Sequence, residues 1–248
     1  MKILLTAINA KYIHSNLAVY CLKAYAEKSF QRNKCFEEQE ESEKQINIEI
    51  AEYTINQQLE DIMMDIYEKH PDVLCLSCYI WNLQYVEALV REIHKVCPDM
   101  PIWLGGPEVS YDAEDVLRRL PEVTGVMMGE GEKTFAQLCE YYAIETYRVE
   151  AADKAEVADI KEVTGRAGVA GGKKAECALT SIVGITFRDK DNNIITNPWR
   201  TPMDLSEVPF VYNNLEDFEN KIIYYETSRG CPFSCSYCLS SIDKKLRF

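Results

Sequence analysis

The sequence predicts an α/β protein built on a doubly wound, five-stranded parallel sheet. Short apolar runs alternate with helix-like patterns five times before residue 145. The third, fourth and fifth runs are each followed by turn-forming residues, and 47% of the 248 residues are apolar, which is enough for a substantial core. Parallel strands need crossover helices, and right-handed crossovers place those helices on both faces of the sheet.

The first two strand–helix units are predicted from their periodicity. Residues 2–8 form a short apolar run typical of a buried strand, and a helical pattern follows over residues 17–29. Residues 46–55 alternate apolar and polar side chains like a half-buried strand. The next helix places one apolar stripe toward the core, made of Leu59, Ile62, Met63, Ile66 and Tyr67.

The remaining units continue the same alternation. Strands are expected at residues 71–79, 101–106 and 123–129, and helices at residues 82–96, 112–120 and 130–142. In open parallel sheets of this kind, ligands bind beyond the carboxyl ends of the strands.

Four regions follow from these patterns. Residues 1–144 form the α/β domain, and residues 145–178, rich in Ala, Gly and charge, read as a loosely ordered linker or insertion. Residues 179–220 predict a β-hairpin around a DKDNN turn, with a connecting arm. Residues 221–248 begin with a predicted strand, KIIYYETS, that leads into a cysteine loop.

Composition excludes several classes of protein. A net charge of −13 disfavours a nucleic-acid partner, and the acidic run at residues 35–45 is expected to be solvated. No apolar run reaches the roughly 18 residues that a membrane span needs, and the start lacks a cleavable leader pattern, so a cytoplasmic chain is expected. Ten cysteines at irregular spacings do not resemble a disulfide scaffold.

The stretch TSRGCPFSCSYC, residues 227–238, is the strongest chemical signal. Its cysteines, Cys231, Cys235 and Cys238, offer three thiolates to one point, and thiolates favour iron–sulfur clusters and other soft metal sites. A cubane held by three thiolates leaves one iron open to substrate. Structural zinc is the competing interpretation, but it needs four ligands and only Cys177 lies nearby. Free thiols are the remaining alternative.

This CxxxCxxC spacing, with Tyr237 before the last cysteine and Arg-Gly before the first, resembles the radical S-adenosylmethionine (SAM) family. The resemblance implies that the three cysteines hold a [4Fe-4S] cluster whose fourth iron binds the amino and carboxylate groups of SAM. Tyr237 would pack near the adenine, and Phe233 would belong to the same cofactor-binding loop. An electron donor would reduce the cluster, and cleavage of SAM would give a 5′-deoxyadenosyl radical.

In that family the cysteine loop follows the first strand of a barrel. Residues 221–228 correspond to that strand, and little of a barrel follows them. The resemblance therefore implies an amino-terminal portion of a longer enzyme, truncated early in the radical SAM domain and inactive by itself.

The chain also resembles, over nearly its whole length, the radical SAM group with an amino-terminal cobalamin (B12)-binding domain of flavodoxin-like or Rossmann-like fold. The matching stretches are residues 76–82, 103–110 and 126–135, which all end at one sheet edge. Glycines there allow close approach of backbone to a bulky ligand. The residues expected to contact cobalamin are Ser77, Tyr79, Trp81, Asn82, Gly105, Gly106, Pro107, Glu108, Gly129, Glu130 and Gly131.

His14 follows the first strand, where some cobalamin domains use a DxHxxG histidine as the cobalt ligand. Here Tyr12 replaces the Asp and Leu17 replaces the Gly, so the alternative is a loop histidine that only forms hydrogen bonds. Cys75 and Cys78 form a CxxC, but they lie along a predicted buried strand and are expected to be core residues.

Three functions follow in order of support. The first is the amino-terminal part of a cobalamin-binding radical SAM enzyme that carries out methyl transfer or another radical reaction on an unknown small-molecule or peptide substrate. The second is a cobalamin-free α/β scaffold or substrate-recognition domain of such an enzyme. The third, an electron-transfer protein, is disfavoured because electron carriers usually saturate their irons with protein thiolates.

Overall fold

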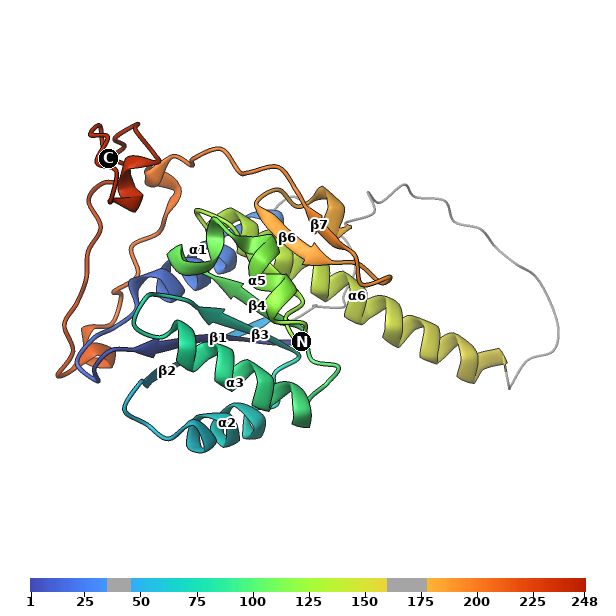
Figure 1. Ribbon diagram of the computed structural model, residues 1–248. Helices are drawn as coiled ribbons and strands as arrows, with labels where there is room; N and C mark the ends of the chain where they lie inside the picture. Colours follow the sequence, from blue (N-terminus) through green and yellow to red (C-terminus); the bar gives the residue numbers. More distant parts are fainter. Residues whose placement is uncertain (35–45, 160–177) are drawn as a thin grey trace.

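The computed structural model describes residues 1–34, 46–159 and 178–248, and it contains the predicted five-stranded parallel sheet (Figure 1). The parallel strands are β1 (Lys2–Asn9), β2 (Asn47–Thr54), β3 (Val73–Ser77), β4 (Ile102–Gly105) and β5 (Gly125–Met127). Their spatial order is β2-β1-β3-β4-β5, so the chain reverses its direction of winding between β1 and β3. This flavodoxin-like order confirms the predicted fold class.

Helices cover both faces of the sheet (Figure 1). Helices α1 (Leu17–Lys34) and α6 (Glu132–Asp159) pack on one face. Helices α2 (Leu59–Glu68), α3 (Leu83–Val96) and α5 (Ala113–Arg119) pack on the other, and the short α4 (Pro107–Ser110) follows β4. Of the described helices, none is both long enough and apolar enough to cross a membrane.

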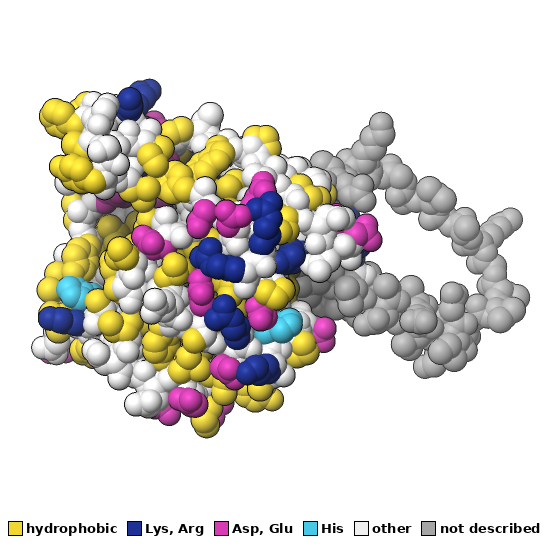
Figure 2. All heavy atoms as spheres, in the orientation of Figure 1, with side chains coloured by type: hydrophobic (Ala, Val, Ile, Leu, Met, Phe, Trp, Pro, Cys, Tyr) yellow, Lys and Arg dark blue, Asp and Glu magenta, His cyan; other side chains and the backbone are white. Residues whose placement is uncertain are grey.

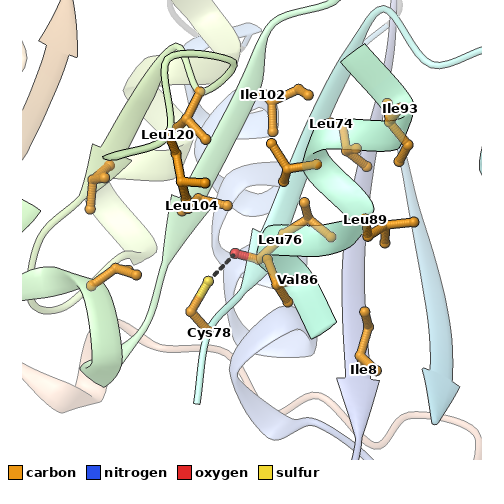
Figure 3. Packing of buried hydrophobic residues seen from close by; sticks show 14 of the residues in the cluster. Ile8, Leu74, Leu76, Cys78, Val86, Leu89, Ile93, Ile102, Leu104 and Leu120 are labelled. Atoms are coloured by element: carbon orange, nitrogen blue, oxygen red, sulfur yellow. Dashed lines mark hydrogen bonds between the residues drawn. The ribbon is translucent and has the colours of Figure 1, made fainter. Parts of the chain in front are cut away.

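Each face of the sheet buries its own apolar layer, because successive side chains of a strand point to opposite faces. Figure 3 shows one layer, in which Val86, Leu89 and Ile93 of α3 point onto Leu74 and Leu76 of β3. On the other face the largest fully buried side chain is Trp103, whose indole N–H donates to the Tyr142 hydroxyl at 2.8 Å.

The predicted hairpin is present and extends the same sheet. Strands β6 (Ile185–Arg188) and β7 (Ile194–Thr196) pair antiparallel with each other, and β6 pairs antiparallel with β5. The described sheet therefore has seven strands. The hairpin satisfies the backbone groups that β5 would otherwise leave unpaired at the edge.

Two sequence predictions differ from the structure. Residues 145–159, predicted as part of a linker, continue α6, because this stretch is rich in Ala and Glu, which favour a helix, and contains no Gly or Pro. The rest of that segment, residues 160–177, and the acidic run at 35–45 lie outside the described residues. Residues 221–228 form no regular strand: only Ile222 makes a bridge, with His14, because no neighbouring strand among the described residues lies alongside them.

Residues 197–248, called here the carboxyl-terminal segment, contain only 3-10 turns as regular elements, at Leu205–Glu207, Leu215–Phe218 and Leu239–Ser241. In Figure 1 this segment, orange to red, runs past the edge where the parallel strands end. In Figure 2 hydrophobic side chains gather over its last part, at the upper left of the view. The position of the segment brings it against the loops that follow the parallel strands.

Candidate functional site

A cavity of about 850 Å³ lies at the carboxyl ends of the parallel strands. Leu5 of β1, Ser77 of β3, Gly105 of β4 and Met127 of β5 all line it. It therefore sits beside the reversal in winding between β1 and β3, where this class of sheet binds its ligands. Its volume is in the range of pockets that hold large organic ligands.

The three loops predicted from the sequence meet at this cavity. The predicted residues that line it are Ser77, Tyr79, Gly105, Gly106, Pro107, Gly129, Glu130 and Gly131. Trp81, Asn82 and Glu108 lie outside its lining. Trp81 stacks on Tyr79 with ring centroids 4.5 Å apart, and the buried Asn82 amide donates to the carbonyl oxygens of Ile8 and Ser77. These two residues hold the loop after β3 in place.

Two glycines give these loops their shape. Gly106 has a φ of +112°, and a Cβ there would lie 2.5 Å from the Cys78 carbonyl oxygen. Gly129 has a φ of +72°, and its N–H donates to the Ser110 hydroxyl at 3.2 Å. Because both positions need a positive φ, the loops after β4 and β5 depend on glycine to approach each other at the cavity.

The carboxyl-terminal segment forms the opposite wall, and sequence reasoning missed it. Trp199, Arg229, Leu239 and Arg247 line the cavity together with the strand-end loops. The Trp199 ring stacks on Tyr111, with centroids 5.3 Å apart. In the sequence only the family resemblance marks Arg229, and no periodicity or spacing marks the other three positions.

The wall carries charge as well as apolar surface. The Arg229 guanidinium donates to both carboxylate oxygens of Glu132, and Arg247 donates to Glu130. Burial alone would lower the pKa of Arg229, but hydrogen bonds to Glu132 and Glu226 outweigh it and raise that pKa above its ordinary value. The four charges are therefore ion-paired across the cavity wall.

His14 lies outside this lining. Its Nδ1 shares a hydrogen bond with the Tyr224 hydroxyl, and its backbone forms the bridge with Ile222. The structure thus gives His14 hydrogen-bonding partners in the carboxyl-terminal segment, and its role as a cobalt ligand stays a prediction.

The loop cysteines, Cys231, Cys235 and Cys238, are all half-exposed. Within residues 1–34, 46–159 and 178–248 no group of three or more His, Cys, Asp or Glu side chains is gathered as a metal site. Phe233 and Tyr237 are exposed by 69% and 91%, and neither lines the cavity. The loop's Leu239, however, faces into it.

The other cysteine pair behaves as core. Cys75 and Cys78 are 2% and 0% exposed, and burial raises the pKa of each thiol to about 12. Both are core residues, as predicted, and Cys75 also lies in the cavity lining. Cys21, also buried, is the thiol of α1 that lines the cavity.

These features define a doubly wound α/β domain with a ligand cavity at its strand-end edge. Residues 3–139 match the model of the B12 binding domain family, and the chain belongs to that family.

The chain also shares sequence with two larger proteins. The chain is 27% identical over 176 residues to the 2-(S-pantetheinyl)-carbapenam-3-carboxylate methyltransferase of Streptantibioticus cattleyicolor, covering 68% of this chain and 22% of that protein. It is also 27% identical over 171 residues to the cobalamin-dependent radical SAM methyltransferase TokK of Streptomyces tokunonensis, with the same coverage.

The fold matches the solved structure of the cobalamin-dependent S-adenosylmethionine radical enzyme OxsB with aqua-cobalamin and S-adenosylmethionine bound. The TM-score is 0.65 at 18% identity, over 99% of this chain and 29% of that one. The chain thus spans less than a third of the length of each of these three proteins.

Proposed function

We propose that this chain binds cobalamin in the strand-end cavity and a [4Fe-4S] cluster with SAM on its cysteine loop, as part of a radical SAM enzyme. One observation carries the proposal: a single cavity is lined both by the loops of the B12-binding domain and by the segment that contains the CxxxCxxC loop. Gly105 and Gly129 come from the first, and Gly230 and Leu239 from the second. The proposed cobalamin site and the loop that would carry the cluster therefore border the same cavity.

The lining of the cavity suits the chemistry of a corrin. Its floor is apolar, with Leu5, Leu76 and Met127, and its rim carries Ser77 and Glu130. A corrin is a broad macrocycle with an apolar face and a periphery of amides, so such a floor and rim match it. When bound, cobalamin supplies a cobalt that carries a methyl group to an acceptor. The protein's own contribution is to hold the ring and exclude water from its face.

Cys231, Cys235 and Cys238 would hold the cluster, which supplies one electron for the reductive cleavage of SAM. Their half-exposed thiols lie on a loop whose Leu239 reaches the cavity. A methyl transfer from cobalamin or another radical reaction is then possible at the same cavity.

The first test is cobalamin retention. The chain is incubated anaerobically with hydroxocobalamin and desalted, and its ultraviolet–visible spectrum is recorded. Ala18→Trp places a bulky ring at an exposed position of α1 that lines the cavity, so this variant is expected to lose the corrinoid. Glu27→Trp, exposed on the same helix but outside the cavity, is expected to retain it.

A wild-type chain that emerges without corrinoid would contradict the cobalamin half of the proposal and favour the scaffold interpretation. His14→Ala is expected to alter the spectrum of bound corrinoid only if His14 ligates cobalt.

The cluster is tested separately. Anaerobic reconstitution with iron and sulfide, followed by electron paramagnetic resonance (EPR) of the reduced protein, is expected to show a [4Fe-4S]⁺ signal that changes when SAM is added. Cys235→Ala is expected to abolish that signal, whereas Cys97→Ala, a half-exposed cysteine outside the loop, is expected to leave it intact. An unchanged signal in Cys235→Ala would refute the assigned ligands.

A further inference from the structure

The cysteine loop (residues 229–247) is closed because the arginines at its two ends pair with each other. Arg229, two residues before Cys231, and Arg247 form an antiparallel bridge in which each N–H donates to the other's carbonyl, at 3.0 and 2.9 Å. The Cys231 N–H donates to the Asp243 carbonyl at 2.8 Å. A Cβ on Gly230 would lie 2.3 Å from the Lys245 carbonyl oxygen, so the two ends of the loop are in close contact.

Both guanidinium groups then reach the same turn of the α/β domain. Arg229 donates to Glu132 at 2.5 and 3.2 Å, and Arg247 donates to Glu130 at 2.5 Å. These carboxylates lie 97 and 117 positions away along the chain. The pairing of Arg229 with Glu132 is bidentate, which fixes orientation as well as distance.

The two pairs are shielded from water. The side chains of Glu132 and Arg229 are 5% and 15% exposed, and those of Glu130 and Arg247 are 21% and 11% exposed. Surface ion pairs contribute little, whereas loss of one partner of a buried pair is costly. Each arginine also has an acidic partner near it in the chain, Glu226 at 2.8 Å from Arg229 and Asp243 at 2.5 Å from Arg247, so Glu132 and Glu130 are the partners that reach across to the α/β domain. Glu132 is also the first residue of α6, where the helix dipole favours a negative charge.

Other ion pairs join the same two regions without touching the loop. Lys133, next to Glu132 on α6, pairs with Glu207 at 2.9 Å, and these side chains are 32% and 36% exposed. Glu207 lies well before the cysteine loop and outside the cavity lining. This pair offers a matched comparison for the buried ones.

We infer that Glu130 and Glu132 are positioning residues that act through Arg247 and Arg229 to hold the cysteine loop over the strand-end cavity. The inference rests on the proposed function, because what is positioned is the cluster-binding loop relative to the cobalamin site. Neither carboxylate needs to touch a reacting group for this role. Their contribution is to set where the loop lies and to keep it closed against the cavity.

The first experiment needs no cofactor. Hydrogen–deuterium exchange of residues 229–247 is measured in the wild-type chain, in Glu132→Gln and in Glu207→Gln. Glu132→Gln is expected to speed exchange in the loop by about tenfold or more while the sheet stays protected, because the loop loses its buried anchor. Glu207→Gln is expected to leave the loop unchanged. Equal loop protection in all three proteins would overturn the inference.

Exchanging the charges of Glu132 and Arg229 distinguishes the loss of their contact from misfolding of the variant. Glu132→Arg and Arg229→Glu are each expected to deprotect the loop, and the double variant is expected to restore part of the protection. No restoration would mean that the contact itself does not hold the loop.

The second readout uses the reconstituted cluster. Glu132→Gln is expected to keep its iron content and its corrinoid but to lose the SAM-induced change in the EPR signal, whereas a purely structural role would leave that change intact. A wild-type chain that assembles no cluster would contradict the proposed function. The hydrogen–deuterium exchange experiment would still decide whether the two carboxylates anchor the loop.

Discussion

The α/β domain and the carboxyl-terminal segment are held by different forces. Strands β1, β3 and β4 are covered on both faces, and the interior side chains are almost fully buried. Between residues 199 and 248 the buried hydrophobic side chains are Met203, Tyr212 and Phe218. That segment is attached mainly by polar contacts to the strand-end edge. Burial of apolar surface is non-directional, whereas ion pairs and hydrogen bonds specify which residues meet.

The largest expected effect is in the sheet. Leu104, fully buried on β4, is expected to lose about 3 kcal/mol of unfolding free energy on replacement by Ala, through lost burial and the cavity left behind. Leu215→Ala, at a side chain 61% exposed in the carboxyl-terminal segment, is the control and is expected to change little. Urea denaturation followed by circular dichroism measures both. Equal losses of unfolding free energy in the two variants would show that burial of apolar side chains does not distinguish the two regions.

A tight contact within the sheet gives the next effect. A Cβ on Gly125 would lie 2.4 Å from the Trp103 ring and 2.9 Å from the Thr186 carbonyl oxygen. Gly125→Ala is therefore expected to cost about 2 kcal/mol through overpacking. Adding Trp103→Phe, which shortens the ring, is expected to reduce the additional cost of the alanine. Thermal melting of the single and double variants measures this, and simple additivity would show that the clash lies elsewhere.

The smallest effect concerns the attachment of the carboxyl-terminal segment and depends on pH. Glu52 lies on β2 with its side chain 8% exposed, and its carboxylate accepts from Lys221, Tyr20, Asn9 and the Asn16 N–H. Burial is the largest influence on its pKa and raises it, but these hydrogen bonds together outweigh burial, so the pKa lies below its ordinary value of 4.5.

A carboxylate with a lowered pKa stabilises the fold above about pH 4.5 and loses that contribution as the pH falls through the folded-state value. Glu52→Gln is expected to cost about 1.5 kcal/mol at pH 7 and to make the loss of stability between pH 5 and pH 3 shallower. Urea titrations across that range test it. Glu92→Gln, in an exposed pair with Lys95, is the control. If stability fell as steeply with decreasing pH in Glu52→Gln as in the wild type, the lowered pKa of Glu52 would be contradicted.

The α/β domain could be predicted from the sequence because its signals are local. Each apolar run or helical stripe is defined by residues a few positions apart, so residues such as Leu74, Leu89 and Leu104 could be assigned to strands and helices before any contact was known. Parallel strands end at one edge, so the convergence of the loops that contain Gly105 and Gly129 also followed.

The same local reasoning failed where neighbours along the chain do not decide the structure. Residues 145–159 looked like a linker from composition but continue α6. Residues 221–228 looked like a strand, yet a strand needs a partner, and here only Ile222 has one.

By itself, the sequence determined the order of strands and helices, the strand-end location of the glycine loops and the presence of three closely spaced thiols. Only the tertiary structure showed that the cysteine loop faces those glycine loops across one cavity, and that Arg229 and Arg247 bind Glu132 and Glu130 there. The physical reason is the distance along the chain between the residues that each kind of signal involves. Periodicity reports on residues a few positions apart, whereas a salt bridge between residues about a hundred positions apart exists only once the fold brings its two charges together.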